Sequence, residues 1–343
     1  MSKIKRIGVD LAKNVFQVHA VDEHGTTLFN KQIKRAALLK WFATVERDES
    51  CVVAMEACGG SQYWGRALQA LNYTVRILHP KFVKAYVQGN KNDRNDASAI
   101  CEAGASPRLQ NVPVRSVEQL DVLVMHRRRE RLTKQRTMVI NQTRGLLAEY
   151  GLVIAKNVTA FYRELPGMIG DADNALTLSA RAQFGAQWEE LMAIDKRLAA
   201  LDKTMEQYAK SNANCRRLMT IEGVGPVTAT AIVAKVGDAQ HFQRARQFSN
   251  SLGIVPGEHS SGGKTQLGAI HKRGDRYSRT LLIHGARSAL NAANEHSAPR
   301  LQKLKAKAVS KDSKNKAIVA LANHNARICY ALLRDRVDYQ IKA

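Results

Sequence analysis

The stretch IKRIGVDLAKNVFQV, residues 4–18, decides the fold of this chain. Its first half is an apolar pattern that ends on Asp10, which predicts a short buried strand closing on a carboxylate. Residues 16–20 alternate between apolar and polar, and a turn over residues 22–25 leads into a further segment, residues 26–32. This pattern predicts two strands joined by a hairpin. At this point Asp10 is either a site residue or an ordinary Asp at a strand end.

The charge balance of the chain indicates a polyanionic partner. Of 343 residues, 53 are Lys or Arg and 30 are Asp or Glu, which gives a net charge of +23. Residues 216–343 carry 22 of the basic and 8 of the acidic side chains, so we expect the C-terminal part to bind most of the polyanion. No uncharged apolar run reaches about 18 residues, and we expect no membrane partner.

Cysteine usage and the N-terminus indicate a cytoplasmic protein. The 5 cysteines are scattered, without the paired spacing of a disulfide frame or a zinc site. The first basic residues are followed at once by the strand that holds Asp10, which is not the pattern of a signal peptide. The length predicts two or three domains.

Three further carboxylates follow Asp10. The apolar run at residues 51–55 predicts a buried strand that ends on Glu56, within an alternation of strands and helices. Asp93 and Asp96 lie at the start of a predicted helix and, three residues apart, share one of its faces. For Asp93 the alternative is a role as helix cap.

These four carboxylates predict a two-metal site for phosphoryl transfer. Acids that lie close together repel one another unless a cation lies between them, and oxygen ligands suit Mg²⁺. Two ions would stabilise the attacking and the leaving oxygen. The expected catalytic acids and metal ligands are Asp10, Glu56, Asp93 and Asp96.

The segments around these acids resemble the three motifs of DEDD-type insertion-sequence transposases. They are IGVDLAK at residues 7–13, MEACG at 55–59 and NDRNDA at 92–97. This is the insertion-sequence 110 family, which includes pilin-gene invertases, and the segment HSSGGK at 259–264 is similar to its 1111 subgroup. The resemblance extends over nearly the whole chain apart from its middle.

The resemblance implies an α/β plus all-α protein with three domains. Residues 1–150 would form a RuvC-like (RNase H-fold) domain that carries the four acids. Residues 151–212 would form a helical coiled-coil arm that joins protomers. Residues 213–343 would form an α-helical transposase domain with a helix-hairpin-helix.

Apolar spacing predicts that the middle of the chain is helical. Apolar residues recur every seven positions at Met125, Leu132, Val139 and Leu146. A second series between residues 191 and 208 is sufficient for an antiparallel hairpin or a dimer contact. The segment LPG at 165–167 and the residues up to 174 are predicted to be a loop.

Basic and glycine residues mark candidate contacts with nucleic acid. Arg127, Arg131 and Lys134 recur at helical spacing, and their alternative is a solvated helix face. Gly223 and Gly225, between two predicted helices, indicate a helix-hairpin-helix, whose exposed N–H groups bind a phosphate without reading bases. A Rossmann loop would need a preceding strand and a third glycine, and the sequence has neither.

The segment GEHSSGGK, residues 257–264, is expected to be a flexible loop that holds a nucleophile. Family members carry a serine followed by glycine after a Gly-Leu/Ile-x-Pro turn, and the match here is GIVP at 253–256, then Ser261. Ser260 is the alternative nucleophile, and Lys264 would offset charge on the transferred group. A second basic turn, also expected to bind nucleic acid, contains Lys272, Arg273 and Arg276.

These patterns predict a transposase or recombinase of a mobile element that cuts and rejoins DNA. The resemblance implies a homo-oligomer, a dimer or a tetramer, and guidance by a structured non-coding RNA that would pair with donor and target DNA. One alternative is a Holliday-junction-type resolvase, which would use water as nucleophile and leave the serine segment unused. The other is a non-catalytic nucleic-acid-binding protein.

Overall fold

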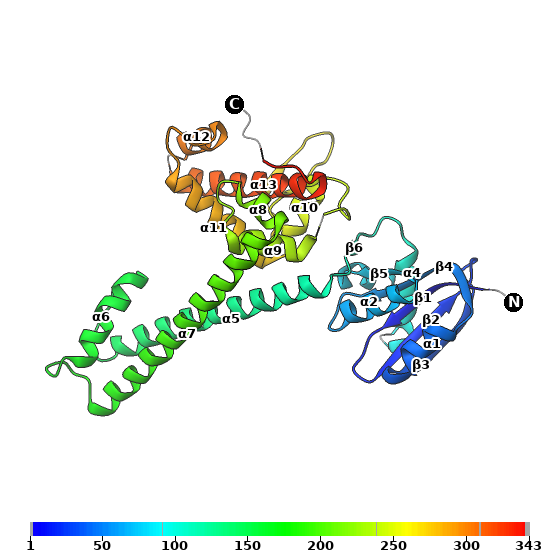
Figure 1. The fold of residues 1–343 in the computed structure, drawn as a ribbon, viewed down its shortest axis with the longest axis horizontal. Helices are drawn as coiled ribbons and strands as arrows, with labels where there is room; N and C mark the ends of the chain where they lie inside the picture. Colours follow the sequence, from blue (N-terminus) through cyan, green and yellow to red (C-terminus); the bar gives the residue numbers. More distant parts are fainter. Residues whose placement is uncertain (1–2, 91, 238, 309, 340–343) are drawn as a thin grey trace. The chain divides into compact units, whose positions relative to one another are not determined.

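The structure of the protein, a computed structural model, describes residues 3–90, 92–237, 239–308 and 310–339. Its contacts divide the chain into two compact units, Met1–Val117 and Glu118–Ala343. The first unit is a sheet covered by helices, and the second is almost wholly helical (Figure 1). This confirms the expected combination of an α/β part with an all-α part.

A six-stranded sheet with the order β3-β2-β1-β4-β5-β6 forms the centre of the first unit. The first three strands are antiparallel neighbours, β4 and β5 run parallel to β1, and β6 is antiparallel to β5. The strands are β1 (Ile4–Asp10), β2 (Val15–Val21), β3 (Thr27–Lys34), β4 (Arg47–Glu56), β5 (Thr74–Leu78) and β6 (Asn111–Val112). The strand that ends on Asp10 and the hairpin after it are confirmed.

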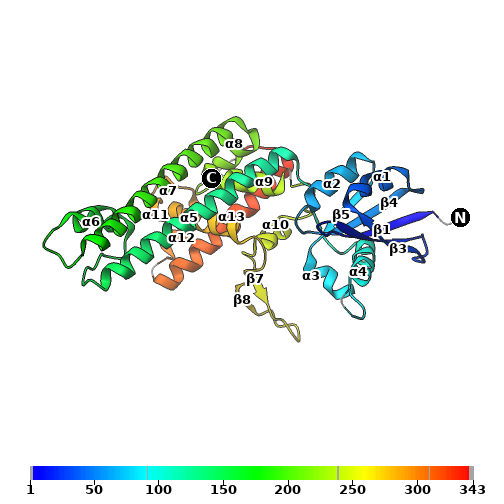
Figure 2. The same ribbon diagram turned by 90° about the horizontal axis from the view of Figure 1, so that it is seen from below.

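Helices cover both faces of this sheet, α1 and α2 on one side and α3 and α4 on the other (Figure 2). Alternation along β1 explains the division, because Ile7 and Val9 pack into the core that includes Trp64 of α2, whereas Gly8 lies beneath α4. The helices are α1 (Leu38–Thr44), α2 (Ser61–Ala70), α3 (Pro80–Val83) and α4 (Asp93–Ala105), with 3-10 turns at Arg35–Ala37 and Lys84–Tyr86.

Two long antiparallel helices, α5 (Val117–Ala148) and α7 (Leu178–Ser211), lie side by side in the second unit (Figure 1). Polar contacts join the two helices at Arg129–Asp202, Arg136–Asp195 and Thr143–Gln187. The residue numbers rise along α5 as they fall along α7, so the helices are antiparallel. A shared apolar core joins both helices to α6 (Val158–Gly170). We call these three helices the arm.

The arm differs from the sequence prediction in two places, the apolar seam and the loop. Leu132 and Val139 are buried, but the next buried leucine is Leu147, and Leu146 is 43% exposed. Seven residues fall about 20° short of two turns of a straight helix, so a strict heptad drifts off the buried face. The loop predicted for residues 165–174 is wrong up to Gly170, since Pro166 lies inside α6, and is confirmed for residues 171–174, which lie between α6 and α7.

The remaining helices surround a separate apolar core. They are α8 (Ala213–Met219), α9 (Pro226–Val236), α10 (Ala245–Leu252), α11 (Arg276–Ala292), α12 (Pro299–Ala306) and α13 (Lys311–Asp335). A two-stranded hairpin of β7 (Pro256–Glu258) and β8 (Leu267–Ile270) connects α10 to α11. No helix in the described part of the chain is long and apolar enough to cross a membrane.

The two units divide after Val117, the first residue of α5, whereas the expected domain boundary at residue 150 falls after this helix. The physical reason is the pairing of α5 with α7, which gives the helix most of its tertiary contacts in the second unit.

Candidate active site

Asp10 and Glu56 lie at the same edge of the sheet. β1 and β4 are parallel neighbours with Val9 opposite Met55, so the next residue of each strand is Asp10 and Glu56. Neighbouring strands are about 4.8 Å apart, and equivalent positions point to the same face. Burial raises the pKa of the Cys58 thiol, and the negative charges of Glu56 and Asp10 raise it further. The negative charges of both carboxylates therefore reach the same thiol, just beyond the strand ends.

Close backbone contacts fix helix α4 over this face. A Cβ at Gly8 would lie 2.3 Å from the Ala97 carbonyl oxygen and 2.5 Å from the Cys101 nitrogen, so only glycine lets the helix approach. Further along α4, a Cβ at Gly104 would lie 2.6 Å from the Ala54 side chain. Since Ala54 pairs with Gly8, and the Arg94 carbonyl of α4 accepts a hydrogen bond from the Asn30 side chain of β3 at 3.1 Å, α4 crosses the strands of the sheet.

Asp10 and Glu56 lie two residues beyond Gly8 and Ala54 on their strands, so they point to the face of the sheet that α4 covers. The first turn of α4 holds Asp93 and Asp96. Asn92 is the N-cap, because its side-chain oxygen accepts a hydrogen bond from the Asn95 nitrogen at 2.9 Å. The alternative role of Asp93 as cap is therefore wrong, and its carboxylate is not needed for that purpose.

Asp10, Glu56 and the acids of α4 thus lie on one face of the sheet, but they are not closed into a ligand set. Among the residues described, no group of three or more His, Cys, Asp or Glu side chains is arranged so that it could hold a metal ion. The donors themselves are carboxylate oxygens, the type that Mg²⁺ and similar hard cations prefer. The chemistry of the donor set therefore fits a divalent ion.

The two glycines of the predicted helix-hairpin-helix have different environments. Gly223 has φ +85° and packs against α11, where an added Cβ would lie 2.7 Å from the Gly285 carbonyl oxygen. Gly225 is exposed at the start of α9, and a Cβ there would meet nothing within 4 Å. Gly223 thus allows the turn to pack closely against α11, and Gly225 lies at the accessible start of α9.

The serine segment is the tip of the β7–β8 hairpin and not an irregular loop. Ser261 pairs with Lys264, whose backbone N–H donates to the Ser261 carbonyl at 3.1 Å. Gly262 and Gly263 between them have φ +56° and +76°, the signs of a type I′ turn, which require glycine or a similar residue. The expected flexible loop is therefore an ordered tight turn.

The two adjacent serines differ in their partners. The Ser260 hydroxyl donates to Glu258 Oε1 at 2.8 Å and accepts from the Gln266 N–H at 3.3 Å. Ser261 is exposed, and the described part of the chain offers its hydroxyl no hydrogen-bond partner. Ser260 is thus held within the hairpin, while the Ser261 hydroxyl faces solvent.

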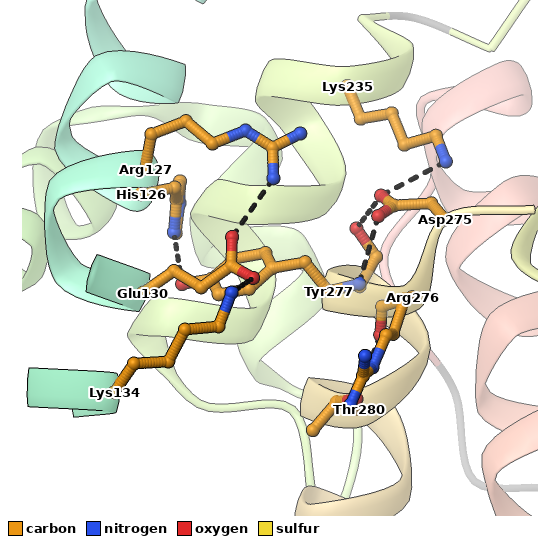
Figure 3. A network of polar contacts seen from close by, with 10 residues as sticks. His126, Arg127, Glu130, Lys134, Lys235, Asp275, Arg276, Tyr277 and Thr280 are labelled. Atoms are coloured by element: carbon orange, nitrogen blue, oxygen red, sulfur yellow. Dashed lines mark hydrogen bonds and ion pairs between the residues drawn. The ribbon is translucent and has the colours of Figure 1, made fainter. Parts of the chain in front are cut away.

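The predicted basic contacts are all at the surface, but two of them are already paired. Arg127 and Lys134 both bind Glu130, at 3.0 and 2.8 Å (Figure 3). Arg131 on the same helix is exposed. Exposed positions are also occupied by Lys264 at the hairpin, Lys272 and Arg273 on the turn before α11, and Arg276 at its start.

A buried histidine network, which no sequence pattern indicated, includes His126 and Tyr277 (Figure 3). His126 of α5 is 2% exposed; its Nδ1 lies 3.0 Å from the Tyr277 hydroxyl and its Nε2 3.1 Å from Thr230 Oγ1. Since Thr230 donates to the Pro226 carbonyl at 2.8 Å, the histidine donates from Nε2 and accepts at Nδ1. The network ties α5 to α9 and α11 through a neutral imidazole.

We expect this histidine to make stability depend on pH. Burial, followed by the positive charges of Arg129 and Arg127, lowers the pKa of His126 to about 4. Between pH 6.5 and 4 the unfolded chain therefore binds a proton that the folded chain does not, and stability falls as pH falls. The loss between pH 7.5 and 5 should be about 2 kcal/mol.

Denaturant unfolding of the wild type and of His126→Gln at both pH values measures this contribution. Gln keeps a donor and an acceptor but does not titrate, so the variant should lose less stability at pH 5. His324, whose pKa is also lowered to about 4, acts equally in both proteins and cancels in the comparison. An identical pH dependence in the two proteins would contradict the assignment.

Comparison with known proteins identifies the family. The family model "Transposase IS116/IS110/IS902 family" matches residues 215–302, and the DEDD transposase model of the IS110 group matches residues 7–152. A "Probable family 20 transposase" of Pseudomonas aeruginosa is 42% identical over 338 residues, covering 98% of this chain and 99% of that protein. The chain belongs to this transposase family.

Other relatives of the transposase agree with this. The "Transposase for insertion sequence element IS1111A" of Coxiella burnetii is 41% identical over 343 residues, covering 100% of this chain and 93% of that protein. A "Pilin gene-inverting protein" of Moraxella bovis is 23% identical over 268 residues, 75% of this chain and 73% of that protein. The resemblance to the insertion-sequence 110 family is confirmed, and the transposase is an enzyme that cleaves DNA and transfers strands.

Proposed function

We propose that the first unit of the transposase is a RuvC-like (RNase H-fold) nuclease domain with Asp10, Glu56, Asp93 and Asp96 as its catalytic acids. The observation that carries this is that Asp10 and Glu56 point to the sheet face covered by α4, the helix whose first turn holds Asp93 and Asp96. The strand order β3-β2-β1-β4-β5 supports the same fold. The family match to residues 7–152 supports a domain of about the extent 1–150.

The same four acids are proposed to hold Mg²⁺, two ions in all. Bound there, the metal would supply charge stabilisation for the attacking and leaving oxygens of a phosphoryl transfer. The carboxylates repel one another at close range, so a cation is what allows them to act together.

In the second unit we propose Ser261 as the nucleophile. Its oxygen forms a new P–O bond with a DNA phosphate, its proton leaves to solvent, and the broken ester bond releases a DNA hydroxyl. The phosphodiester energy stays in the protein–DNA link, and attack by a DNA hydroxyl restores serine and rejoins the strand. The exposed hydroxyl at a glycine turn supports Ser261, whereas Ser260 is held by Glu258.

Nucleic-acid binding is proposed to use the exposed residues of the C-terminal part. Gly225 at the α9 start, together with Gly223 in a helix-hairpin-helix turn, would present N–H groups to a phosphate. Lys264, Lys272, Arg273 and Arg276 would contact backbone near the hairpin. A structured non-coding RNA from the same element would choose the DNA sites, and sequencing the RNA that purifies with the protein tests this.

Strand transfer on DNA that carries the element ends is the direct test of this function. The purified protein with its co-purified nucleic acid should join element and target DNA in the presence of Mg²⁺ and not in the presence of a chelator. A Holliday-junction-type resolvase would cut branched DNA but join no element ends. A non-catalytic binding protein would give neither product with any divalent ion.

The oligomer is proposed to form at the outer end of the arm, with residues 151–212 as the joining domain. Apolar side chains are exposed there where α5 ends and α7 begins, among them Val153 at 77% and Leu178 at 87%. The seam residue Leu201, by contrast, is 7% exposed and packs within its own chain. Charge at Leu201 would therefore disrupt the arm itself.

Replacing Val153 and Leu178 by Asp should lower the mass measured by light scattering, because each change puts charge into the proposed contact. Val124→Asp is the matched control, since Val124 is 67% exposed on α5 at a distance from the arm's outer end. Equal masses for the double variant, the control and the wild type would remove the arm end as the contact.

A further inference from the structure

A groove of about 500 Å³ lies on the arm, lined by α7 and by Arg128 of α5. The α7 residues that line it, from Ala193 to Thr204, are spaced by three and four and so share one face of the helix. At 1.5 Å per residue they extend over about 16 Å. Ala193 and Ala200 keep the floor of the groove low, and Lys196 and Arg197 lie between them.

The acids near the groove are used within the arm. Asp202 binds Arg129 at 2.6 Å, and Asp195 binds Arg136 at 2.8 Å. Glu130 takes both Arg127 and Lys134, as Figure 3 shows.

The cations of the groove have no such partners. Within the described ranges no ion pair includes Arg128, Lys196 or Arg197, and all three are exposed. The groove therefore carries three positive charges that the arm does not compensate.

We propose that this groove binds the phosphodiester backbone of the nucleic acid that the transposase handles. The proposal rests on the proposed function and adds a specific binding place to it. Arg128 and Arg197 present guanidinium groups that can bind a phosphate through two N–H donors, and Lys196 adds a point charge. A length of about 16 Å matches about five nucleotide steps of 3.4 Å along one strand. Backbone contacts of this kind position nucleic acid without reading its sequence.

This assignment moves the phosphate contacts of the arm from Arg127 and Lys134 to the groove. The spacing of basic residues along α5 cannot distinguish the two sets, because Glu130 neutralises one of them in space. Arg128 differs from Arg127 in pointing to the α7 side, where it lines the groove.

The test compares Ala200→Glu with Ala200→Gln in the full-length protein. Both replacements have the same size and suit a helix, but only Glu puts a negative charge on the groove floor. Binding is measured over a range of salt concentrations with a DNA duplex carrying an element end and, separately, with RNA transcribed from the element flank. Ala200→Glu should weaken binding to at least one of the two nucleic acids roughly tenfold or more, while binding by Ala200→Gln stays within about twofold of the wild type.

A second pair of variants checks the number of contacts. Lys196→Ala with Arg197→Ala should reduce the slope of log K against log salt by about 1.8 for duplex DNA, or about 1.4 for single strands. Lys203→Ala with Lys210→Ala removes the same charge from α7 outside the groove and should leave the slope nearly unchanged.

Loss of affinity for DNA or for RNA supports the proposal and identifies the source of the phosphodiester. Equal binding by Ala200→Glu and Ala200→Gln to both overturns it. A drop in mass by light scattering without loss of binding also overturns it, because the groove would then be a contact between protein copies. Metal-dependent cleavage at saturating protein is recorded in parallel, so failure of the proposed function is distinguished from failure of the groove.

Discussion

Asp10→Asn should reduce DNA cleavage by about three orders of magnitude or more and leave binding to nucleic acid within about twofold. The amide keeps the size of the side chain and removes the negative charge on which metal binding and transition-state stabilisation depend. Glu56→Gln, Asp93→Asn and Asp96→Asn should have similar effects. Residues that act as one unit are not additive, so Asp10→Asn with Asp96→Asn should be little worse than either change alone.

Cleavage of labelled element-end DNA at saturating protein measures the chemical step separately from binding. Glu102→Gln is the matched control, because Glu102 is an exposed acid in α4, beyond the first turn that holds Asp93 and Asp96. It should cleave like the wild type. Substantial cleavage by the Asp10→Asn, Asp96→Asn double variant would exclude the proposed site, and equal losses in Glu102→Gln would indicate a general effect of charge.

Ser261→Ala should abolish a covalent protein–DNA adduct that the wild type forms. Without the hydroxyl, the P–O bond that conserves the phosphodiester energy cannot form, so strand joining should fall below detection as well. The turn should still form, because Gly262 and Gly263 and not the serine hydroxyl provide its backbone conformation. The adduct is measured as a band that survives denaturation, after reaction with labelled DNA and Mg²⁺.

Ser260→Ala is the control for this experiment and should retain the adduct. Its hydroxyl binds Glu258, and losing that bond should loosen the hairpin and slow the reaction by a modest factor only. An adduct that persists in Ser261→Ala and disappears in Ser260→Ala would reassign the nucleophile, with Glu258 as its base. No adduct in any active preparation would favour water as nucleophile.

The candidate acids could be found from the sequence because each motif combines local signals. An apolar strand that ends on a carboxylate predicts where Asp10 and Glu56 lie, since the ends of parallel neighbours meet at one edge of the sheet. The place of Asp93 and Asp96 depends on something the pattern does not contain. Gly8 and Gly104 allow α4 to touch the sheet on the face to which Asp10 and Glu56 point.

The basic residues show more clearly what residue spacing alone cannot predict. Arg127, Arg131 and Lys134 share one face of α5, and their spacing left phosphate contact and a solvated helix face as alternatives. In the structure Glu130 forms ion pairs with two of them. Lys196 and Arg197 of α7, about seventy positions further along the chain, line the groove together with Arg128. Which cations remain uncompensated is decided by ion pairs within and between helices.

The sequence by itself determined the strands that end on Asp10 and Glu56, the hairpin after the first of them, the helical middle of the chain and the family, because these follow from short-range periodicity, turn chemistry and local motifs. Tertiary structure alone decided the rest. Pro166 stays inside α6 because burial of Phe161 and Leu165, 0% and 1% exposed, outweighs the lost backbone hydrogen bond. Gly223 serves packing because Gly285, far along the chain, lies against it. Long-range contacts of this kind leave no periodic trace in a single sequence, since either partner alone satisfies its own local pattern.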